Sequence, residues 1–235
     1  MTLKKYIPNT ITSMNALCGT VGVVFALQGR PDIAFIFLIA AAVFDFCDGL
    51  AARLLHAYSD MGKELDSLSD MVSFGVLPSV ILYETMVLCG VNAQVALCPL
   101  ILAVFSALRL AKFNVDTRQG TDFIGVATPT SALICGSLGY FVYNSPDSVL
   151  ASWCGTVWFL PALAVVLCAL LVCEIPMFGM KVAPGHKLLD GKRIVFLALA
   201  AVAIILVIVL GLNWSLAVLA IFSIYIVENL ILALL

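Results

Sequence analysis

Four aspartates, close together in a chain with few charges, are the residues of this sequence best suited to chemistry. Asp45 and Asp48 lie three residues apart, and Asp66 and Asp70 lie four apart. Side chains with either spacing are neighbours on one face of a helix. Ionised carboxylates gathered in a low-dielectric pocket repel one another strongly unless a cation lies among them. The spacing therefore predicts a metal site.

The predicted metal is a hard divalent cation. Carboxylate oxygens suit Mg²⁺ and Mn²⁺, and Mg²⁺ commonly binds through a few carboxylates together with substrate phosphates. Two ions that share carboxylates can stabilise both the entering and the departing oxygen of a phosphoryl transfer. We therefore expect the four aspartates to hold two ions, either Mg²⁺ or Mn²⁺.

The residues around the aspartates favour a diphosphate ligand. Gly49 and Gly62 lack side chains and would allow a ligand to approach the backbone closely. Arg53 follows Gly49 by one helical turn, and its guanidinium can pair with a phosphate oxygen. The segment Leu55 to Gly62 is short enough to make the flanking helices antiparallel neighbours, so that the two carboxylate pairs face each other.

The elements that position these residues are membrane-spanning helices. Of the 235 residues 63% are hydrophobic and 11% are charged, and the mean hydropathy is +1.14. Soluble domains are only about 45–50% apolar, so the chain is expected to be an integral membrane protein with an all-α fold. Apolar runs of about 20 residues predict eight spans, at about 14–28, 32–54, 64–88, 92–114, 129–144, 155–176, 193–211 and 214–232.

The predicted organisation is a polytopic bundle of six spans followed by a C-terminal pair of helices. Residues 1–13 are expected to form an N-terminal interfacial segment. The six spans, which contain all four aspartates, are expected to cover residues 14–181, and a basic loop with a two-helix hairpin residues 182–235.

The positive charges predict the orientation of the bundle. In the eight-span arrangement, eleven of the twelve Lys and Arg residues fall on one side, and only Arg30 falls on the other. Cytoplasmic loops carry an excess of Lys and Arg. Both termini and the aspartates are thus expected on the cytoplasmic side of the cell (inner) membrane, and no nucleic-acid partner is expected.

The pattern Asp45-x2-Asp48-Gly49-x2-Ala52-Arg53-x8-Gly62-x3-Asp66-x3-Asp70 resembles the signature of the CDP-alcohol phosphatidyltransferase family at eight positions. The resemblance implies a core of six transmembrane helices, often dimeric, with an active site open to the cytoplasm. It also implies transfer of a phosphatidyl group from CDP-diacylglycerol to an alcohol, with release of CMP. A homodimer is therefore expected.

The same resemblance implies roles for individual residues. All four aspartates would bind the metal pair, and Asp70 would also be the general base. The residues implied to contact CDP-diacylglycerol are Asn9, Thr12, Gly49, Arg53, Ser59 and Gly62.

The acceptor alcohol has to be inferred from other segments. Residues 71–79, 109–114, 125–132 and 170–181 resemble segments typical of membrane-embedded phosphatidylserine synthases from bacteria and archaea, which implies L-serine as acceptor. Arg109 could pair with the serine carboxylate, with Lys112 and Asn114 nearby. Alternatively, Arg109 and Lys112 only contribute to the positive-inside distribution.

Two other functions stay open from the sequence. One is phosphatidylglycerophosphate synthase or another enzyme of the same family, because the signature does not select the acceptor. The other is an ion-coupled transporter. Transporter sites usually lie near the membrane midplane between repeated halves, whereas these acids cluster toward one face and no repeat is visible.

Overall fold

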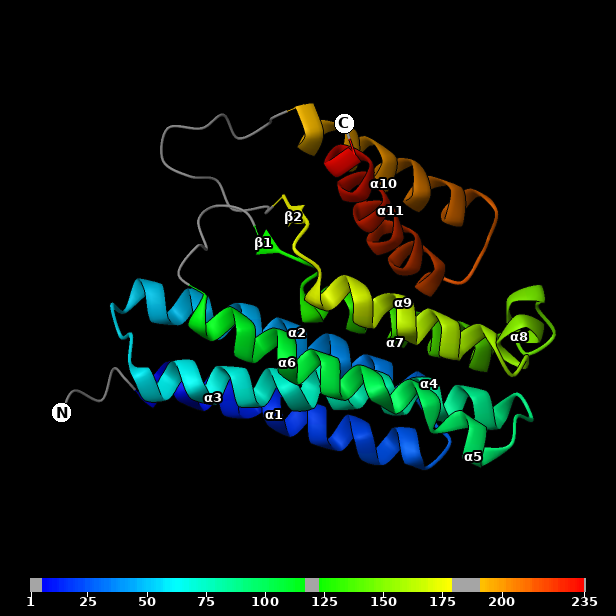
Figure 1. Ribbon diagram of the computed structural model, residues 1–235, viewed down its shortest axis with the longest axis horizontal. Helices are drawn as coiled ribbons and strands as arrows, with labels where there is room; N and C mark the ends of the chain where they lie inside the picture. The colour runs from blue at the N-terminus through cyan, green and yellow to red at the C-terminus, as the bar shows by residue number, and fades with distance from the viewer. Residues whose placement is uncertain (1–5, 117–122, 179–190, 235) are drawn as a thin grey trace.

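The structure is a computed structural model that describes residues 6–116, 123–178 and 191–234, and it is a helical bundle (Figure 1). The helices are α1 (Tyr6–Leu27), α2 (Pro31–Leu54), α3 (Asp60–Asp70), a π-helix (Met71–Val76), α4 (Leu77–Leu88), α5 (Ala93–Ala96), a 3₁₀ turn (Cys98–Leu100), α6 (Ile101–Val115), α7 (Thr128–Asn144), α8 (Val149–Cys154), α9 (Phe159–Val172), α10 (Gly191–Val209) and α11 (Ser215–Leu234). The strands are β1 (Phe123–Ile124) and β2 (Pro176–Met177).

The all-α membrane fold is confirmed. Within the described residues, six helical segments are long and apolar enough to cross a membrane: Tyr6–Leu27, Pro31–Leu54, Asp60–Leu88, Ala93–Val115, Gly191–Val209 and Ser215–Leu234. The other two predicted spans coincide with shorter helices, α7 of 17 residues and α9 of 14. The count of eight spans therefore stays a prediction.

Residues 6–13 of the expected interfacial segment are helical. Helix α1 begins at Tyr6 and runs to Leu27, so these residues form the first turns of the same helix as the first candidate span. Their position at the membrane interface stays a prediction. Pro8 is tolerated there because the first helical turn needs no backbone N–H donor. Three hydroxyls each donate to the carbonyl oxygen four residues earlier, which satisfies them within the helix: Thr10, Thr12 and Ser13.

The third span contains a π-helix directly after Asp70. Pro78 has no N–H to donate to the carbonyl of Phe74, four residues earlier, and its ring would crowd that carbonyl in a regular helix. The widened π-helix Met71–Val76 ends just before this proline. Gly19 of α1 lies against this segment, since a Cβ on Gly19 would come within 2.8 Å of the Ser73 Cα. The first and third spans are thus in backbone contact beside Asp70.

A short antiparallel ladder joins the chain before α7 to the chain after α9. Phe123 pairs with Met177 and Ile124 pairs with Pro176. Gly125 follows with φ of +73°, and a Cβ there would lie 2.9 Å from two carbonyl oxygens at the end of α9. This position requires glycine, both for its left-handed backbone and for the close approach.

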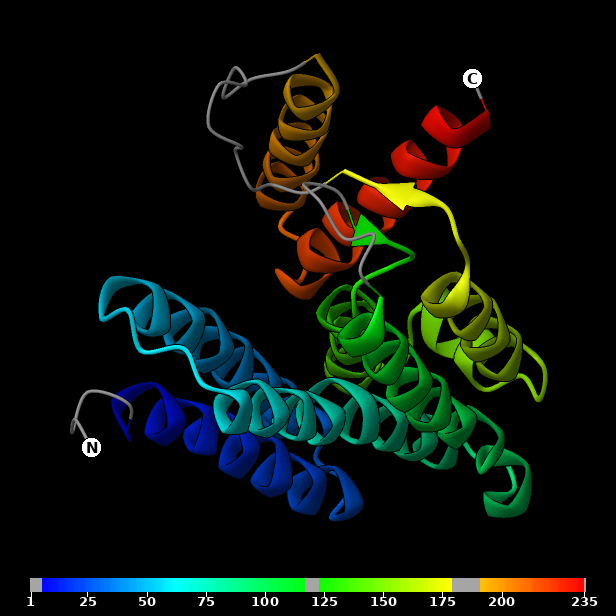
Figure 2. The same ribbon diagram turned by 60° about the vertical axis from the view of Figure 1, so that its left-hand side comes forward.

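The C-terminal hairpin of α10 and α11 crosses over the rest of the bundle, with α11 against α7 (Figures 1 and 2). The backbone after β2 is held by α11, because the Phe178 N–H donates to Asn229 Oδ1 at 2.8 Å and the Tyr225 hydroxyl donates to the Phe178 carbonyl at 3.0 Å. The last two helices, in which the sequence showed no motif, therefore anchor the segment that leaves the core.

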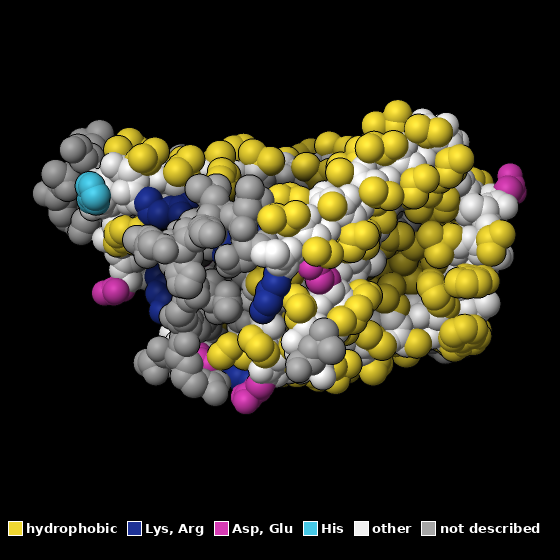
Figure 3. All heavy atoms as spheres, turned by 90° about the horizontal axis from the view of Figure 1, so that it is seen from above, with side chains coloured by type: hydrophobic (Ala, Val, Ile, Leu, Met, Phe, Trp, Pro, Cys, Tyr) yellow, Lys and Arg dark blue, Asp and Glu magenta, His cyan; other side chains and the backbone are white. Residues whose placement is uncertain are grey.

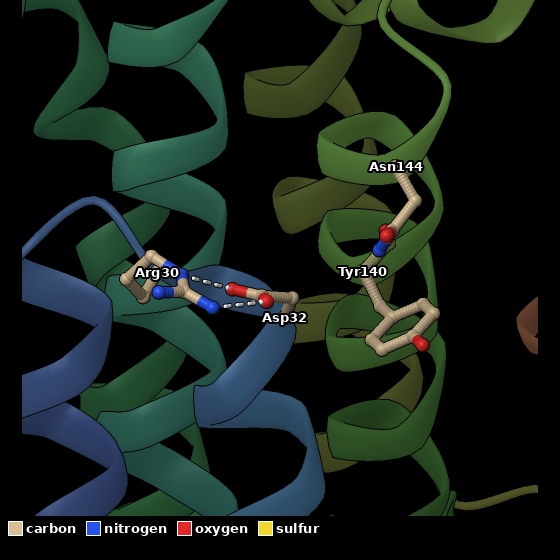
Figure 4. A network of polar contacts seen from close by, with 4 residues as sticks. All are labelled: Arg30, Asp32, Tyr140 and Asn144. Atoms are coloured by element: carbon tan, nitrogen blue, oxygen red, sulfur yellow. Dashed lines mark hydrogen bonds and ion pairs between the residues drawn. The ribbon is translucent and has the colours of Figure 1, made fainter.

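Arg30 lies at the end of the bundle opposite the aspartates. Its Nε and Nη2 donate to the two Asp32 oxygens at 2.9 and 2.8 Å (Figure 4). Its guanidinium also lies 5.7 Å from the centre of the Tyr143 ring. The hydrogen bonds to Asp32 raise the pKa of Arg30 further above its usual range. The charge of this arginine is therefore balanced locally.

Candidate active site

Three of the four aspartates form a compact cluster between α2 and α3. One oxygen each from Asp45, Asp48 and Asp66 lies within 4.8 Å of the others. Asp48 is 5% exposed, and Asp48 Oδ2 and Asp66 Oδ1 are buried atoms with no hydrogen-bond partner among the described residues. Buried carboxylate oxygens without donors fit a hard divalent cation, which accepts oxygen ligands and balances their charge. The donor set therefore suits the expected metal.

Asp70 lies deeper, at the last residue of α3, and contributes no oxygen to that three-oxygen group. Its Oδ1 accepts a hydrogen bond of 3.2 Å from Asn15 Nδ2 of α1. Asn15 is fully buried, and its backbone carbonyl accepts a hydrogen bond of 3.0 Å from the Ser73 hydroxyl. Asn15 is thus held by one hydrogen bond at its side chain and another at its backbone.

Asn15 is a candidate functional residue that the sequence analysis missed. Its Oδ1 is buried without a hydrogen-bond partner among the described residues. A signal was available, because Asn9, Thr12 and Asn15 follow one another at intervals of three and so share one helix face. This polar face of α1 opens toward the aspartates.

A cavity of about 230 Å³ adjoins the aspartate cluster between α1, α2 and the start of α3. Asp48 and Asp66 contribute to its wall. Five of the six residues expected to contact the CDP-lipid also line it: Asn9, Thr12, Gly49, Ser59 and Gly62. The sixth, Arg53, is exposed and donates from Nε to the Gly49 carbonyl at 2.9 Å. The structure thus brings these five residues together beside the carboxylates.

Glycine keeps this cavity open at two points. A Cβ on Gly62 would lie 3.0 Å from both Asn9 Oδ1 and Ser59 Oγ, whereas a Cβ on Gly49 would meet nothing within 4 Å. Ser59 also begins α3, because its Oγ accepts a hydrogen bond of 3.1 Å from the Gly62 N–H. The linker between α2 and α3 is shorter than the predicted segment from Leu55 to Gly62, because α3 already starts at Asp60.

The packing around the cavity depends on α1. Helix α1 packs along α2 and also along α3, so it bridges the two helices that carry the aspartates (Figure 2). The short linker predicts that α2 and α3 are direct neighbours. The carboxylates do meet, but their helices are held by a third element, and the space between the three helix ends forms the cavity.

The three residues expected near serine have different surroundings. Arg109 of α6 is 8% exposed, its guanidinium lies 4.9 Å from the centre of the Phe113 ring, and it is within Coulombic range of Asp70. Lys112 pairs with Glu174 at 3.1 Å. Asn114 donates to Ser67 Oγ at 2.8 Å. Arg109 is therefore the residue of the three with a buried charge near the aspartates.

A sequence profile described as CDP-alcohol phosphatidyltransferase matches residues 5–170. The chain belongs to the CDP-alcohol phosphatidyltransferase family. Members of this family generally use divalent metals, in agreement with the aspartate cluster. The chain is therefore a phosphatidyltransferase. The match contains α1 to α8, most of α9 and all four aspartates, but not α10 or α11.

Several CDP-alcohol phosphatidyltransferases are similar to the chain over long stretches. The CDP-diacylglycerol–serine O-phosphatidyltransferase of Mycobacterium leprae is 34% identical over 208 residues, which is 85% of this chain and 67% of that protein. The protein of the same name from Bacillus subtilis is 38% identical over 154 residues, 64% of this chain and 83% of that protein. An archaetidylserine synthase from Methanothermobacter thermautotrophicus is 34% identical over 137 residues, 56% of each chain.

Proposed function

We propose that this enzyme transfers the phosphatidyl group of CDP-diacylglycerol to the hydroxyl of L-serine, giving phosphatidylserine and CMP. The observation that carries the proposal is the cluster of Asp45, Asp48 and Asp66, whose carboxylates adjoin a cavity lined by five of the residues expected to contact the CDP-lipid. Because this cavity lies at the ends of the helices, it suits the headgroup of a lipid whose acyl chains stay in the bilayer.

The donor diphosphate lies in this cavity. Asp45, Asp48, Asp66 and Asp70 would hold two divalent ions, Mg²⁺ or Mn²⁺, and such ions neutralise the diphosphate and stabilise the departing CMP. Gly49 and Gly62 leave room for the diphosphate against the backbone. Around it, Asn9, Thr12 and Ser59 offer polar groups, and Arg53 borders the same helix end.

Asp70 acts as the general base. The serine hydroxyl loses its proton to Asp70 as its oxygen bonds to the phosphorus next to diacylglycerol, and the bond from that phosphorus to the CMP oxygen breaks. The Asn15 amide holds Asp70 Oδ1 by a hydrogen bond, so the second carboxylate oxygen can face the acceptor. In-line displacement of this kind requires positioning and charge stabilisation but no covalent enzyme intermediate.

Serine is favoured as acceptor by two lines of support. Relatives at 34% and 38% identity carry the name CDP-diacylglycerol–serine O-phosphatidyltransferase. In addition, the buried Arg109 guanidinium is close enough to Asp70 for a favourable charge interaction. At this position it can pair with the serine carboxylate. Lys112 and Asn114 follow Arg109 on α6 and would offer further polar groups to the acceptor.

The enzyme lies in the cell (inner) membrane with its active site facing the cytoplasm. It works as a homodimer. Each chain has a catalytic core over residues 14–181 and a C-terminal hairpin over residues 182–235. The charge distribution supports this orientation. Arg30 lies at the far end and is paired with Asp32, while the basic side chains visible in Figure 3 gather toward the end that carries the N-terminus.

One assay separates the candidate activities. The purified protein is incubated with CDP-diacylglycerol, Mg²⁺ or Mn²⁺ and one candidate alcohol at a time, and both CMP and the lipid product are measured. We expect CMP release that depends on serine and is absent in an Asp66→Asn variant. Release with glycerol 3-phosphate instead would identify a phosphatidylglycerophosphate synthase. Solute uptake into liposomes driven by an ion gradient, without CMP release, would identify a transporter.

A further inference from the structure

A second cavity lies between α10 and α11, away from the aspartates. Its volume is about 550 Å³, within the range of small-molecule sites. Its walls are apolar side chains from both helices: Val195, Leu199, Ile224, Val227, Ile231 and Leu232. Two charged residues, Lys192 and Glu228, also line it. We call this cavity the hairpin groove.

Glu228 is an unusual residue for a spanning helix. It lies six residues before the end of α11, which at 1.5 Å per residue is about 9 Å from the helix end. Its Oε2 is buried and has no hydrogen-bond partner among the described residues. An ionised acid at such a depth is costly unless it is paired, so a cationic partner would stabilise this carboxylate.

Lys192 lies at the same end of the hairpin. It is the second residue of α10, and α10 and α11 are consecutive helices that contact each other. Lys192 and Glu228 both line the groove. Among the residues that the structure describes, no carboxylate lies within 4 Å of its ammonium group. One groove thus offers a cation, an anion and a long apolar wall.

We propose that the hairpin groove binds an aminophospholipid, a lipid whose headgroup carries a phosphate and a primary ammonium. The ammonium donates to Glu228, the phosphate pairs with Lys192, and one acyl chain covers the wall formed by Leu199 and Ile224. The carboxylate disfavours phosphatidylglycerol, which has a phosphate but no cation. A choline headgroup has no N–H to donate to Glu228.

The groove is distinct from the reaction site. The aspartate cluster and its cavity are formed by α1, α2 and α3, and the groove by α10 and α11. Occupancy of the groove therefore does not depend on the proposed reaction. A lipid held there would brace the hairpin that anchors Phe178 through Tyr225 and Asn229.

The test is lipid binding by native mass spectrometry of the delipidated full chain. Phosphatidylethanolamine, phosphatidylserine and phosphatidylglycerol with identical acyl chains are added in equal amounts. We expect both aminophospholipids to be retained over phosphatidylglycerol. Glu228→Gln should lower the ratio of bound phosphatidylethanolamine to phosphatidylglycerol by roughly three- to tenfold, as for a modest ion pair near the interface.

Controls identify where the lipid binds. Asp147→Asn removes an exposed acid from another part of the chain and should leave the ratio unchanged. Leu199→Trp keeps both charges but fills the groove and should reduce retention of all three lipids, provided that its thermal unfolding matches the wild type. The phosphatidylethanolamine arm is independent of the reaction site, because this lipid is neither substrate nor product there.

Three results would overturn the proposal. An equal ratio of bound phosphatidylethanolamine to phosphatidylglycerol in the wild type and Glu228→Gln would show that Glu228 does not bind the ammonium group. Binding of phosphatidylserine alone, insensitive to Glu228→Gln, would locate the lipid in the reaction site. A change of oligomeric mass in the groove variants at constant lipid ratio would make the groove a contact between two copies of the chain.

Discussion

Asn15 Nδ2 lies 3.2 Å from Asp70 Oδ1, although the two residues are 55 positions apart in the sequence. The amide is fully buried and its own backbone carbonyl is bonded to Ser73. A carboxylate that accepts a fixed donor on one oxygen keeps the other oxygen in a defined direction. Asn15 is therefore a positioning residue for the proposed base.

Replacing Asn15 tests that role. Asn15→Ala should lower kcat by about 10- to 100-fold, the range expected when a hydrogen bond to a charged group is lost, while the KM for CDP-diacylglycerol changes little. Asn144→Ala is the matched control, because Asn144 also donates from Nδ2, in this case to the Tyr140 carbonyl at 2.8 Å near the paired Arg30 (Figure 4). Equal kcat values for the two variants would exclude the positioning role.

Asp70→Asn separates catalysis from binding. An amide keeps the shape of the side chain but cannot accept the serine proton, so turnover should fall by roughly 10²- to 10⁴-fold. Binding of CDP-diacylglycerol, measured by calorimetry, should largely persist, because the amide keeps the shape of the side chain and the three clustered carboxylates of Asp45, Asp48 and Asp66 remain as metal ligands. A variant that turns over at the wild-type rate would assign the proton to another group.

Metal binding can be measured without turnover. Chelation with EDTA should abolish activity, and Mn²⁺ should restore it. Asp48→Asn should weaken Mn²⁺ binding, followed by electron paramagnetic resonance, by at least roughly tenfold, since losing even an outer-shell partner causes that much. Asp60→Asn is the control, because Asp60 is exposed and outside the cluster. Identical Mn²⁺ affinities in the two variants would contradict the assigned ligands.

Gly49→Ala should change stability and substrate binding in opposite directions. A Cβ there meets nothing within 4 Å, so the alanine should stabilise α2 by about 0.5–1 kcal/mol, seen as a higher Tm. The same methyl group would occupy the space of the diphosphate and raise the KM for CDP-diacylglycerol. Gly191→Ala, also unobstructed, should leave that KM unchanged. A Gly49→Ala enzyme with wild-type KM would place the donor elsewhere.

Arg109 and Lys112 should differ in their effect on serine. Arg109→Lys keeps the charge but loses the planar fork and should raise the KM for serine by about tenfold, with little change for CDP-diacylglycerol. Lys112→Met removes a partly exposed pair with Glu174, and such pairs contribute about 0–1 kcal/mol, so the KM for serine should change less than for Arg109→Lys. The reverse order would make Lys112 the carboxylate partner.

Much of the site could be predicted from the sequence because its chemistry is local. The pairs Asp45 and Asp48, and Asp66 and Asp70, each lie on one helical segment, so spacing alone gives their common face. The approach of three of these carboxylates to within 4.8 Å confirms that the two segments face each other. The apolar runs likewise predicted the helices, because membrane spans are recognised by their length and composition.

The remaining features depend on contacts between distant segments. The bond from Asn15 to Asp70 and the role of α1 as a bridge follow from packing, which no spacing rule supplies. The ladder between β1 and β2 joins residues more than fifty positions apart. The π-helix had a local signal in Pro78, but a proline within an apolar run also fits a simple kink.

The position of the cavity at the ends of α1, α2 and α3 places the residues proposed for the two substrates on different parts of the chain. The groups proposed for the nucleotide-lipid all lie before residue 77, whereas Arg109 and the ladder that adjoins it come from residues 101–178. Substitutions that change the acceptor alcohol are therefore expected among the later residues, with the donor-binding residues unchanged. Donor recognition and acceptor recognition would then be separable by mutation within one fold.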